Sequence, residues 1–511
     1  MAALAPRTYN AAAIGKRRVA LTTPLAFTIL ALATILLRIG TMWTEQLDWD
    51  EWSFILMGAD VAQGHLPFVH QFDLKPPLIF FLFGATITVF GKSILAIRLL
   101  GAACVFAAAI FVFLTGRRAA GAWPALGGAL LTTALASAPF GQATGTELPA
   151  IAFLAAAAWY LTRCPLGTRG AAVSGMLVAL AVLTRSNLAV VAVVIGGLLF
   201  ATSQFSRPGI SRWAWAAFAA AGLVPPALLV FAYAAAGASA TLKLAMIDVP
   251  LAYSGQLGMF EVARQHATQF YYTAQTRPLL YAPCALLAIS GSVIALRTLL
   301  RRGDPAQAWL LIVLFAMTAA VAGSLLIGGA AYPHYWLQLM PFAGVLATLG
   351  IAGLSRAALK ARYAAAALVA VPLVGGIAVS LRALPTSYTS PHSAEQAAAY
   401  IRATGGDRPS VWALHQHLTL WYLDAPQLSR AGVHPDNLAR HAIIDTLAAH
   451  RYVGPDEVDR LMALRPVFVI TDARGKGVAW VRTDGKPIDA WLAANYRPDA
   501  QFGDIVLFRR R

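Results

Sequence analysis

The sequence has few charged residues. Only 12% of its 511 residues are Asp, Glu, Lys or Arg, whereas 58% are hydrophobic. A soluble domain carries roughly a quarter charged residues, so a soluble globular enzyme is excluded for most of the chain. Disordered and fibrous proteins are excluded by the same composition.

Cysteine is also scarce, and the common nucleotide-binding motifs are missing. The three cysteines, Cys104, Cys164 and Cys284, lie in or beside apolar runs, which predicts no disulfide framework. The sequence lacks a P-loop, a G-x-G-x-x-G motif before a helix, and an H-E-x-x-H motif. A nucleotide substrate on the cytoplasmic side is therefore not expected. An activated group carried by a lipid would instead supply a reaction at the outer face.

Long apolar runs dominate what is present. About 20 apolar residues are needed for a helix to cross the hydrocarbon of a bilayer. Eleven runs that we expect to be transmembrane helices begin near Ala20, Leu95, Gly121, Leu148, Gly170, Leu188, Trp213, Pro278, Ala306, His334 and Arg362. The first is interpreted as a retained span, because the residues before it are polar and basic for too long to form a signal peptide.

Basic residues indicate the direction of the spans. The formal net charge is +17. If residues 16–18 are cytoplasmic and the short run 76–90 does not cross, every second loop is basic. These loops contain Arg117, Arg118, Arg163, Arg169, Arg207, Arg212, Arg297, Arg301, Arg302, Arg356, Lys360 and Arg362. Positive loops stay in the cytoplasm, so residues 76–90 are predicted to form an interfacial or re-entrant helix on the outer side.

Three segments then lie outside: the loops 42–94 and 237–277, and the tail 385–511. The tail is soluble in character. It alternates predicted helices at 395–403, 457–464 and 488–495 with predicted strands at 410–414, 466–471 and 504–509. We therefore predict a mainly α, polytopic membrane helical bundle over residues 1–384 and a small α/β domain over residues 385–511.

An acidic cluster follows the first span. Asp48, Asp50 and Glu51 stand beside Trp49 and Trp52, whose rings suit the membrane interface. Ionisable groups near membrane depth are functional candidates. The alternative is an ordinary acidic loop with an aromatic belt.

A second candidate is the segment Asp73-Leu74-Lys75-Pro76-Pro77. Two prolines favour a helix start and leave Lys75 at its N-terminal end. A cation at a helix N-terminus suits a phosphate. The alternative is a snorkelling lysine.

Further polar residues lie at the outer ends of later spans. Arg98 and Glu147 end the second and begin the fourth span, and Arg185 lies in a short turn after the fifth. An arginine there suits a lipid phosphate, although an interfacial snorkelling arginine is the alternative. His334 and Gln338 are four residues apart, which predicts that they share a helix face.

The order of these motifs resembles the protein O-mannosyltransferase and lipid A aminoarabinose-transferase superfamily, which are integral-membrane glycosyltransferases of the GT-C fold. The resemblance covers roughly residues 20–354. Its motifs are Trp49-Asp50-Glu51, Gly64-His65-Leu66-Pro67, Asp73-Leu74-Lys75-Pro76-Pro77, Phe90-Gly91-Lys92-Ser93, Arg98-Leu99, Thr146-Glu147, Leu183-Thr184-Arg185 and His334-Tyr335 through Pro341. Three departures, Leu74 before the lysine, Lys75 in place of histidine and Glu147 in place of aspartate, leave the donor sugar and the acceptor open.

The resemblance implies an inverting transfer of a sugar from a polyprenyl phosphate to a glycolipid, polysaccharide or protein acceptor. It implies that Asp50 is the catalytic base in an acidic motif shared with Glu51. Lys75, Arg185 and Arg98 would bind the donor phosphate. Glu51 and Arg98 have an alternative role as an ion pair that positions the Asp50 loop.

The remaining matched residues, Asp73, Glu147, His334 and Tyr335, would bind the sugar or the acceptor. No cofactor is expected with certainty. A divalent cation stays open because carboxylates abound, although Lys75 beside them would replace the charge of a cation. Nucleic acid is not an expected partner. The alanine- and arginine-rich composition indicates a bacterium, so we expect the inner membrane, with a cytoplasmic N-terminus and a periplasmic tail.

Three other functions remain open. A transporter or flippase would also have many spans, although the repeated halves frequent in transporters are not evident. An O-antigen-ligase-like enzyme would depend on Arg264 and His266 and not on Asp50. A membrane-anchored binding module would act through its tail.

Overall fold

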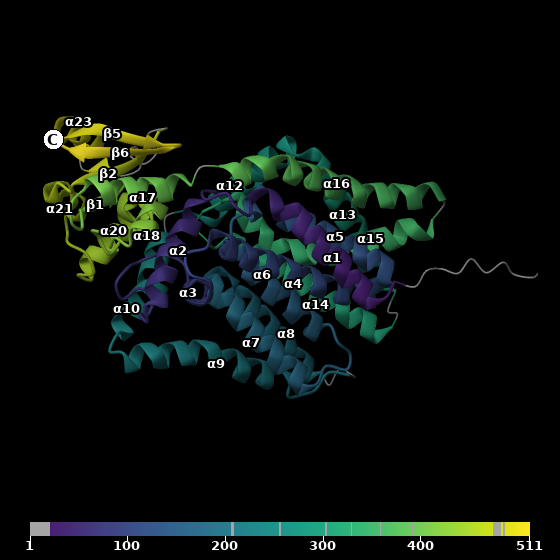
Figure 1. The fold of residues 1–511 in the computed structure, drawn as a ribbon. Coiled ribbons are helices and arrows are strands. Elements are labelled where there is room, and N and C mark those ends of the chain that lie inside the picture. The colour runs from purple at the N-terminus through teal and green to yellow at the C-terminus, as the bar shows by residue number, and fades with distance from the viewer. Residues whose placement is uncertain are drawn as a thin grey trace, which may run out of the picture.

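The computed structural model describes residues 21–205, 209–254, 257–301, 304–328, 330–357, 359–390, 392–473, 482–483 and 486–511. Figure 1 shows a long bundle of helices that carries a small sheet domain at one end. The chain is a multi-pass membrane protein with a mainly α fold, as the composition predicts.

Among the described residues, eight helical segments are long and apolar enough to cross a membrane. Each matches one of the expected runs. They contain α1 (Thr23–Arg38), α4 (Ile94–Ala120), α8 (Ala189–Gln204), α9 (Ala214–Ala235), α13 (Pro278–Leu300), α14 (Pro305–Leu325), α15 (Met340–Arg356) and α16 (Leu359–Thr389).

The other three expected runs form shorter apolar helices: α5 (Ala122–Ala136), α6 (Glu147–Leu161) and α7 (Thr168–Thr184). The side chains of α5 and α6 are buried on nearly all sides, as expected for helices surrounded by other helices. The run at 76–90 forms α3 (Leu78–Phe90), which at 13 residues is too short to span a bilayer alone.

Glycines let several membrane helices approach one another closely. A Cβ atom on Gly291 of α13 would lie 1.8 Å from the carbonyl oxygen of Leu346 in α15, and one on Gly350 of α15 would lie 2.2 Å from that of Leu287. Small residues allow such backbone contact between helices in a membrane, where packing replaces the hydrophobic effect as the main attraction. These two helices therefore form a rigid pair.

The loops expected outside are partly helical. The first contains α2 (Trp49–Ala62) and α3, which pack against each other at the end of the bundle that carries the tail (Figure 1). The second contains α10 (Ser239–Lys243), a π-helical turn (Leu244–Asp248), α11 (Val249–Ser254) and α12 (Met259–Thr276).

The tail forms the expected α/β unit, although α16 continues to Thr389, beyond the expected boundary at 384. Its elements are α17 (Ser393–Thr404), β1 (Val411–Ala413), α18 (Leu418–Leu423), α19 (Pro435–Ala439), α20 (His441–Ala449), α21 (Glu457–Leu464), β2 (Phe468–Asp472), β3 (Arg482–Thr483), β4 (Lys486–Pro487), α23 (Ile488–Asn495), β5 (Tyr496–Phe502) and β6 (Ile505–Arg510). The main sheet has the order β1-β2-β6-β5, in which β1 and β2 are parallel and the other pairs antiparallel. All predicted helices and strands of the tail form. The short helices α18 to α20 and the strand β5 form in addition to the predicted elements.

The tail and the first outer loop share one hydrophobic core. Trp52 and Phe54 of α2 are buried in the same cluster as Trp412 and Trp421 of the tail. Glu45, just before α2, accepts a hydrogen bond of 2.8 Å from the Ala394 N–H at the start of α17. The tail is thus packed directly onto α2.

Candidate active site

The three carboxylates of the acidic cluster face three different environments. Asp48 is the N-cap of α2, and its Oδ1 accepts a hydrogen bond of 2.9 Å from the Asp50 N–H. Consecutive helical residues point about 100° apart, because a turn contains 3.6 residues. Asp50 accordingly faces a cavity, whereas Glu51 points into the bundle and is 1% exposed.

Glu51 and Arg98 form a buried ion pair. Arg98 donates to Glu51 and, at 2.9 Å, to the carbonyl oxygen of Thr44. The same Glu51 oxygen accepts the Thr144 N–H at 2.6 Å. Neither charged residue is among the described residues that line the cavity. Of the two roles expected for this pair, the structure therefore forms the positioning ion pair. It does not place Arg98 for a phosphate contact or Glu51 for a catalytic one.

Asp50 meets two partners from distant parts of the chain. The Lys75 ammonium lies 3.2 Å from Oδ1 and 3.1 Å from Oδ2 of Asp50. Nε2 of His434, in the tail, lies 3.0 Å from Oδ1. Nδ1 of His434 accepts the Asp436 N–H at the start of α19, at 3.1 Å. The imidazole proton is therefore on Nε2, where His434 donates it to Asp50.

Electrostatics keep Asp50 ionised. Burial alone would raise the pKa of Asp50, but Lys75 and His434 outweigh it and hold that pKa well below its usual range. Burial would lower the pKa of Lys75, but the charges of Asp50 and Asp73 outweigh burial, so the pKa of Lys75 lies above its ordinary value. Burial, followed by the Asp50 charge, raises the pKa of Asp48 to about 7. At neutral pH the cavity thus presents an Asp50 carboxylate and a Lys75 ammonium.

Arg185 lies on another wall of the cavity and is held on several sides. It donates to Glu147 and, at 3.0 Å, to the Thr146 hydroxyl. Its guanidinium carbon lies 4.2 Å from the ring centroid of Tyr335, a cation–π contact. Nε2 of His334 is 3.7 Å from a Glu147 oxygen. Glu147 is buried behind these groups and is not among the described lining residues, so it orients Arg185 and His334 from behind.

His334 and Gln338 do not share a face, contrary to the expectation from their spacing. The segment Pro333–Leu339 is a 3₁₀ helix, in which residues three apart eclipse and residues four apart do not. His334 lines the cavity. Gln338 is fully buried and accepts a hydrogen bond of 3.0 Å from Asn187, which also donates to Ser324.

The cavity measures about 570 Å³ and has one charged and one apolar side. Of the expected site residues, Asp50, Asp73, Lys75, Arg185, His334 and Tyr335 line it. The apolar side consists of Met246, Ile247, Leu251, Leu325 and Ile327. The tail adds His434, Asp436, Asn437 and Ile443.

The outer loop 237–277 closes over the site only in part. Its first half reaches the cavity through the π-helical turn and Tyr253. In the second half, Arg264 is exposed and pairs with Glu261 at 2.7 Å. His266 accepts from the Trp336 indole at 3.1 Å, and its other nitrogen lies 3.2 Å from the carbonyl oxygen of Leu325. Both nitrogens of His266 are thus engaged, which does not favour an O-antigen-ligase-like site here.

Several cavity residues escaped the analysis of the sequence. His434 begins a His-Pro-Asp sequence that is typical of a helix start, and this local signal says nothing about Asp50. Asn187 lies in the same turn as Arg185, but the motif there ends at Arg185. Tyr253 lies in the outer loop 237–277, where no motif identifies contacts. No sequence pattern pairs residues 384 positions apart, as Asp50 and His434 are.

Comparisons with known proteins agree with this architecture. The family model "Dolichyl-phosphate-mannose-protein mannosyltransferase" matches residues 74–251, which include Lys75, Glu147 and Arg185. The structure resembles ArnT from Cupriavidus metallidurans in the apo state, with a TM-score of 0.64 and 13% identity over 95% of this chain and 98% of that chain. The chain has the GT-C fold. The resemblance predicted from the motifs is confirmed at this level.

Two other GT-C structures are similar. ArnT from the same organism bound to undecaprenyl phosphate matches with a TM-score of 0.58 and 14% identity, over 96% of this chain and 98% of that chain. The oligosaccharyltransferase AglB from Archaeoglobus fulgidus, in complex with an inhibitory peptide and a dolichol-phosphate, matches with a TM-score of 0.54 and 12% identity, over 96% and 74% of the two chains. No curated protein sequence matches the chain.

The Glu51–Arg98 pair generates a stability prediction. Arg98→Met leaves the Glu51 charge buried without its partner, which costs about 3–5 kcal/mol. We expect a lower midpoint of thermal unfolding in detergent. The double variant Glu51→Gln/Arg98→Met removes both charges and should recover part of the loss. Wild-type stability of Arg98→Met, together with a raised KM for the donor, would instead assign Arg98 to donor binding.

Proposed function

We propose that this protein is an inverting glycosyltransferase. It transfers a hexose or pentose from a polyprenyl-phosphate carrier to a glycolipid, polysaccharide or protein, at the periplasmic face of a bacterial inner membrane. The observation that carries the proposal is the single cavity in which the Asp50 carboxylate, the Lys75 and Arg185 cations and an apolar wall come together. The match to ArnT bound to undecaprenyl phosphate supports the donor class.

The two cations account for the phosphate. Lys75 offers a compact point charge, and Arg185 offers a planar group that pairs with two phosphate oxygens. Glu147, Thr146 and Tyr335 hold the Arg185 guanidinium before the donor arrives. Such prearranged charge stabilises the phosphate as the glycosidic bond breaks.

The apolar wall accounts for the carrier. Ile247, Leu251 and Ile327 line the cavity and yet are 49%, 67% and 57% exposed. Large aliphatic side chains left open beside a charged site favour a ligand with a charged head and a hydrocarbon chain. In this pose the phosphate meets the cations and the first isoprene units lie along these residues.

Asp50 acts as the base in the proposed reaction. The acceptor hydroxyl gives its proton to Asp50, and its oxygen forms a bond to the anomeric carbon. The bond from that carbon to the phosphate oxygen breaks on the opposite side, so the configuration inverts. Polyprenyl phosphate leaves as an anion and needs no acid, which fits a cavity that contains the Asp50 carboxylate together with the Lys75 and Arg185 cations.

Donor binding also changes the strength of this base. Lys75 contacts both oxygens of Asp50 and lowers the pKa of Asp50, which makes the carboxylate a weak base. A donor phosphate competes for the same ammonium. As Lys75 turns toward the phosphate, the pKa of Asp50 rises and the carboxylate becomes a better proton acceptor.

Removal of the base tests the proposal. We expect Asp50→Asn to lower kcat by about 10²–10⁴-fold, the usual contribution of a general base. In cells that lack the wild-type gene, the polyprenyl-phosphate sugar should accumulate in this variant and be visible by mass spectrometry. Asp445→Asn, an exposed aspartate on α20, is the matched control. Full restoration of the wild-type lipid profile by Asp50→Asn would refute the assignment.

A pH profile tests the role of Lys75. Asp50 must be deprotonated to act, so kcat/KM falls as the pH drops through its pKa. Lys75→Gln removes the cation that lowers this pKa, so the acidic limb should move to higher pH. Lys75→Arg keeps the charge and should keep the limb near its wild-type position. An unchanged limb in Lys75→Gln would show that Lys75 does not tune Asp50.

His434 gives the tail a positioning role. Its hydrogen bond to Asp50 fixes the rotamer of the carboxylate, and a bond to a charged group contributes about 1.5–3 kcal/mol. His434→Leu should lower kcat roughly 10- to 100-fold with little change in the donor KM. His434→Gln keeps a donor at similar reach and should recover much of kcat. Loss of thermal stability alone, with kcat intact, would make His434 purely structural.

A further inference from the structure

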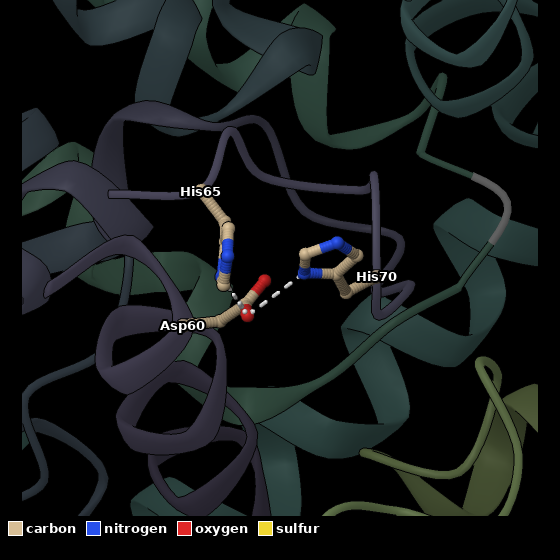
Figure 2. A group of neighbouring side chains, drawn as sticks. All are labelled: Asp60, His65 and His70. Carbon is tan, nitrogen blue, oxygen red and sulfur yellow. Dashed lines mark hydrogen bonds and ion pairs between the residues drawn. The ribbon is translucent and has the colours of Figure 1, made fainter. Parts of the chain in front are cut away.

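A cluster of two histidines and an aspartate lies outside the cavity, at the end of α2. Asp60 comes from the last turn of α2, and His65 and His70 come from the loop that follows (Figure 2). Both imidazole rings direct Nδ1 to the same carboxylate oxygen, Oδ1 of Asp60, at 2.8 Å for His65 and 3.3 Å for His70. One possible ligand atom from each residue lies within 4.8 Å of the others.

The two distances to Oδ1 of Asp60 are close to the edges of a small coordination sphere. Zinc binds histidine nitrogen and carboxylate oxygen at about 2.0–2.2 Å, so neighbouring ligands in a tetrahedral site are roughly 3.3 Å apart. The His70 contact already has this length, and the His65 contact is about half an ångström shorter. The side chains of His65 and His70 are 39% and 50% exposed, whereas that of Asp60 is 9% exposed. An ion can therefore enter from solvent, and water can supply a fourth ligand.

The backbone holds His65 in place. The His65 N–H donates to the carbonyl oxygen of Asp60 at 3.3 Å, which turns the chain back over the helix end. Gly64 makes this turn with a φ of +93°, a conformation that favours glycine. The first histidine is thus fixed relative to the carboxylate.

Other parts of the protein hold the loop before His70. The carbonyl oxygens of three consecutive residues, Pro67, Phe68 and Val69, each accept a hydrogen bond from a different side chain. The donors are Tyr233 of α9 and Tyr452 and Arg430 of the tail. These bonds hold the backbone up to the residue before His70, which lowers the cost of ordering the second histidine.

We propose that Asp60, His65 and His70 form a binding site for a divalent transition metal of the zinc type. Imidazole nitrogen with one carboxylate is a donor set that suits zinc and its neighbours in the series more than magnesium or calcium. None of the three is among the described residues that line the cavity. The metal would connect the end of α2 to the loop that continues into Asp73 and Lys75. This inference does not rest on the proposed function.

Metal stoichiometry tests the proposal directly. The full-length protein in detergent is stripped with a chelator, desalted, incubated with Zn²⁺ and desalted again, and its zinc is measured by mass spectrometry. We expect one zinc per chain in the wild type and a higher unfolding temperature in its presence, because a ligand that binds the folded state stabilises it. His65→Asn and His70→Asn should each weaken binding by roughly 10- to 100-fold or more and lose most of the zinc-dependent shift.

The control is His441→Asn, which removes the exposed histidine of the His441–Asp445 pair on α20. It should bind zinc as the wild type does. The metal-free unfolding temperatures of the variants show that they fold. Absence of bound zinc in the wild type would mean that the histidines merely donate hydrogen bonds to Asp60. Equal zinc in the wild type, His65→Asn and His70→Asn would place the ion elsewhere. Either result overturns the proposal whatever the transfer activity.

Discussion

The buried ion pair between Glu51 and Arg98 is the constraint on which the site depends. Both side chains are 1% exposed, and a buried charge requires a partner of opposite sign. Glu51 can satisfy this requirement only if the first turn of α2 packs against α4 and the segment before α6. With Glu51 held inward, helical geometry turns Asp50 toward the cavity. A structural contact thereby aims the proposed base.

The same helix connects the membrane bundle with the tail. Its buried aromatic residues share a core with Trp412 and Trp421, and its end carries the Asp60 cluster. Tyr452 and Arg430 of the tail donate hydrogen bonds to the loop between α2 and Lys75. The tail is consequently part of the site: it supplies His434 to Asp50, and Arg440 bonds to the Tyr332 hydroxyl at 2.9 Å beside the cavity. Without this tail the cavity would lose the part of its lining that contains His434.

Charge balance distinguishes the groups of the site. Of the neighbouring carboxylates, Glu51 is neutralised by Arg98, Glu147 by Arg185 and Asp50 by Lys75. The Glu51–Arg98 pair is buried away from the cavity, whereas Arg185 and the Asp50–Lys75 pair line it. In the proposed reaction a donor phosphate would compete with Asp50 for Lys75 and with Glu147 for Arg185. Donor binding and proton transfer would then depend on the same salt bridges.

The class of protein and many of the residues that line the cavity follow from the sequence alone. Apolar runs with basic alternate loops predict a membrane bundle, because a helix must be long and apolar to cross lipid, and the motif order indicates the GT-C fold. Asp50, Lys75, Arg185, His334 and Tyr335 were all named from these motifs, and they meet in one cavity.

The orientation of these side chains and their long-range partners depend on how distant segments pack. Whether Glu51 or Asp50 faces the cavity depends on which side of α2 packs against Arg98. The sequence around α2 does not show that Arg98 is the partner, because Arg98 lies in another helix. The 3₁₀ turn at Pro333–Leu339 separates His334 from Gln338 although their spacing suits an α-helix. His434 reaches Asp50 only because the tail packs onto α2. Periodicity and motifs report local preferences, whereas these contacts arise from packing between segments hundreds of residues apart.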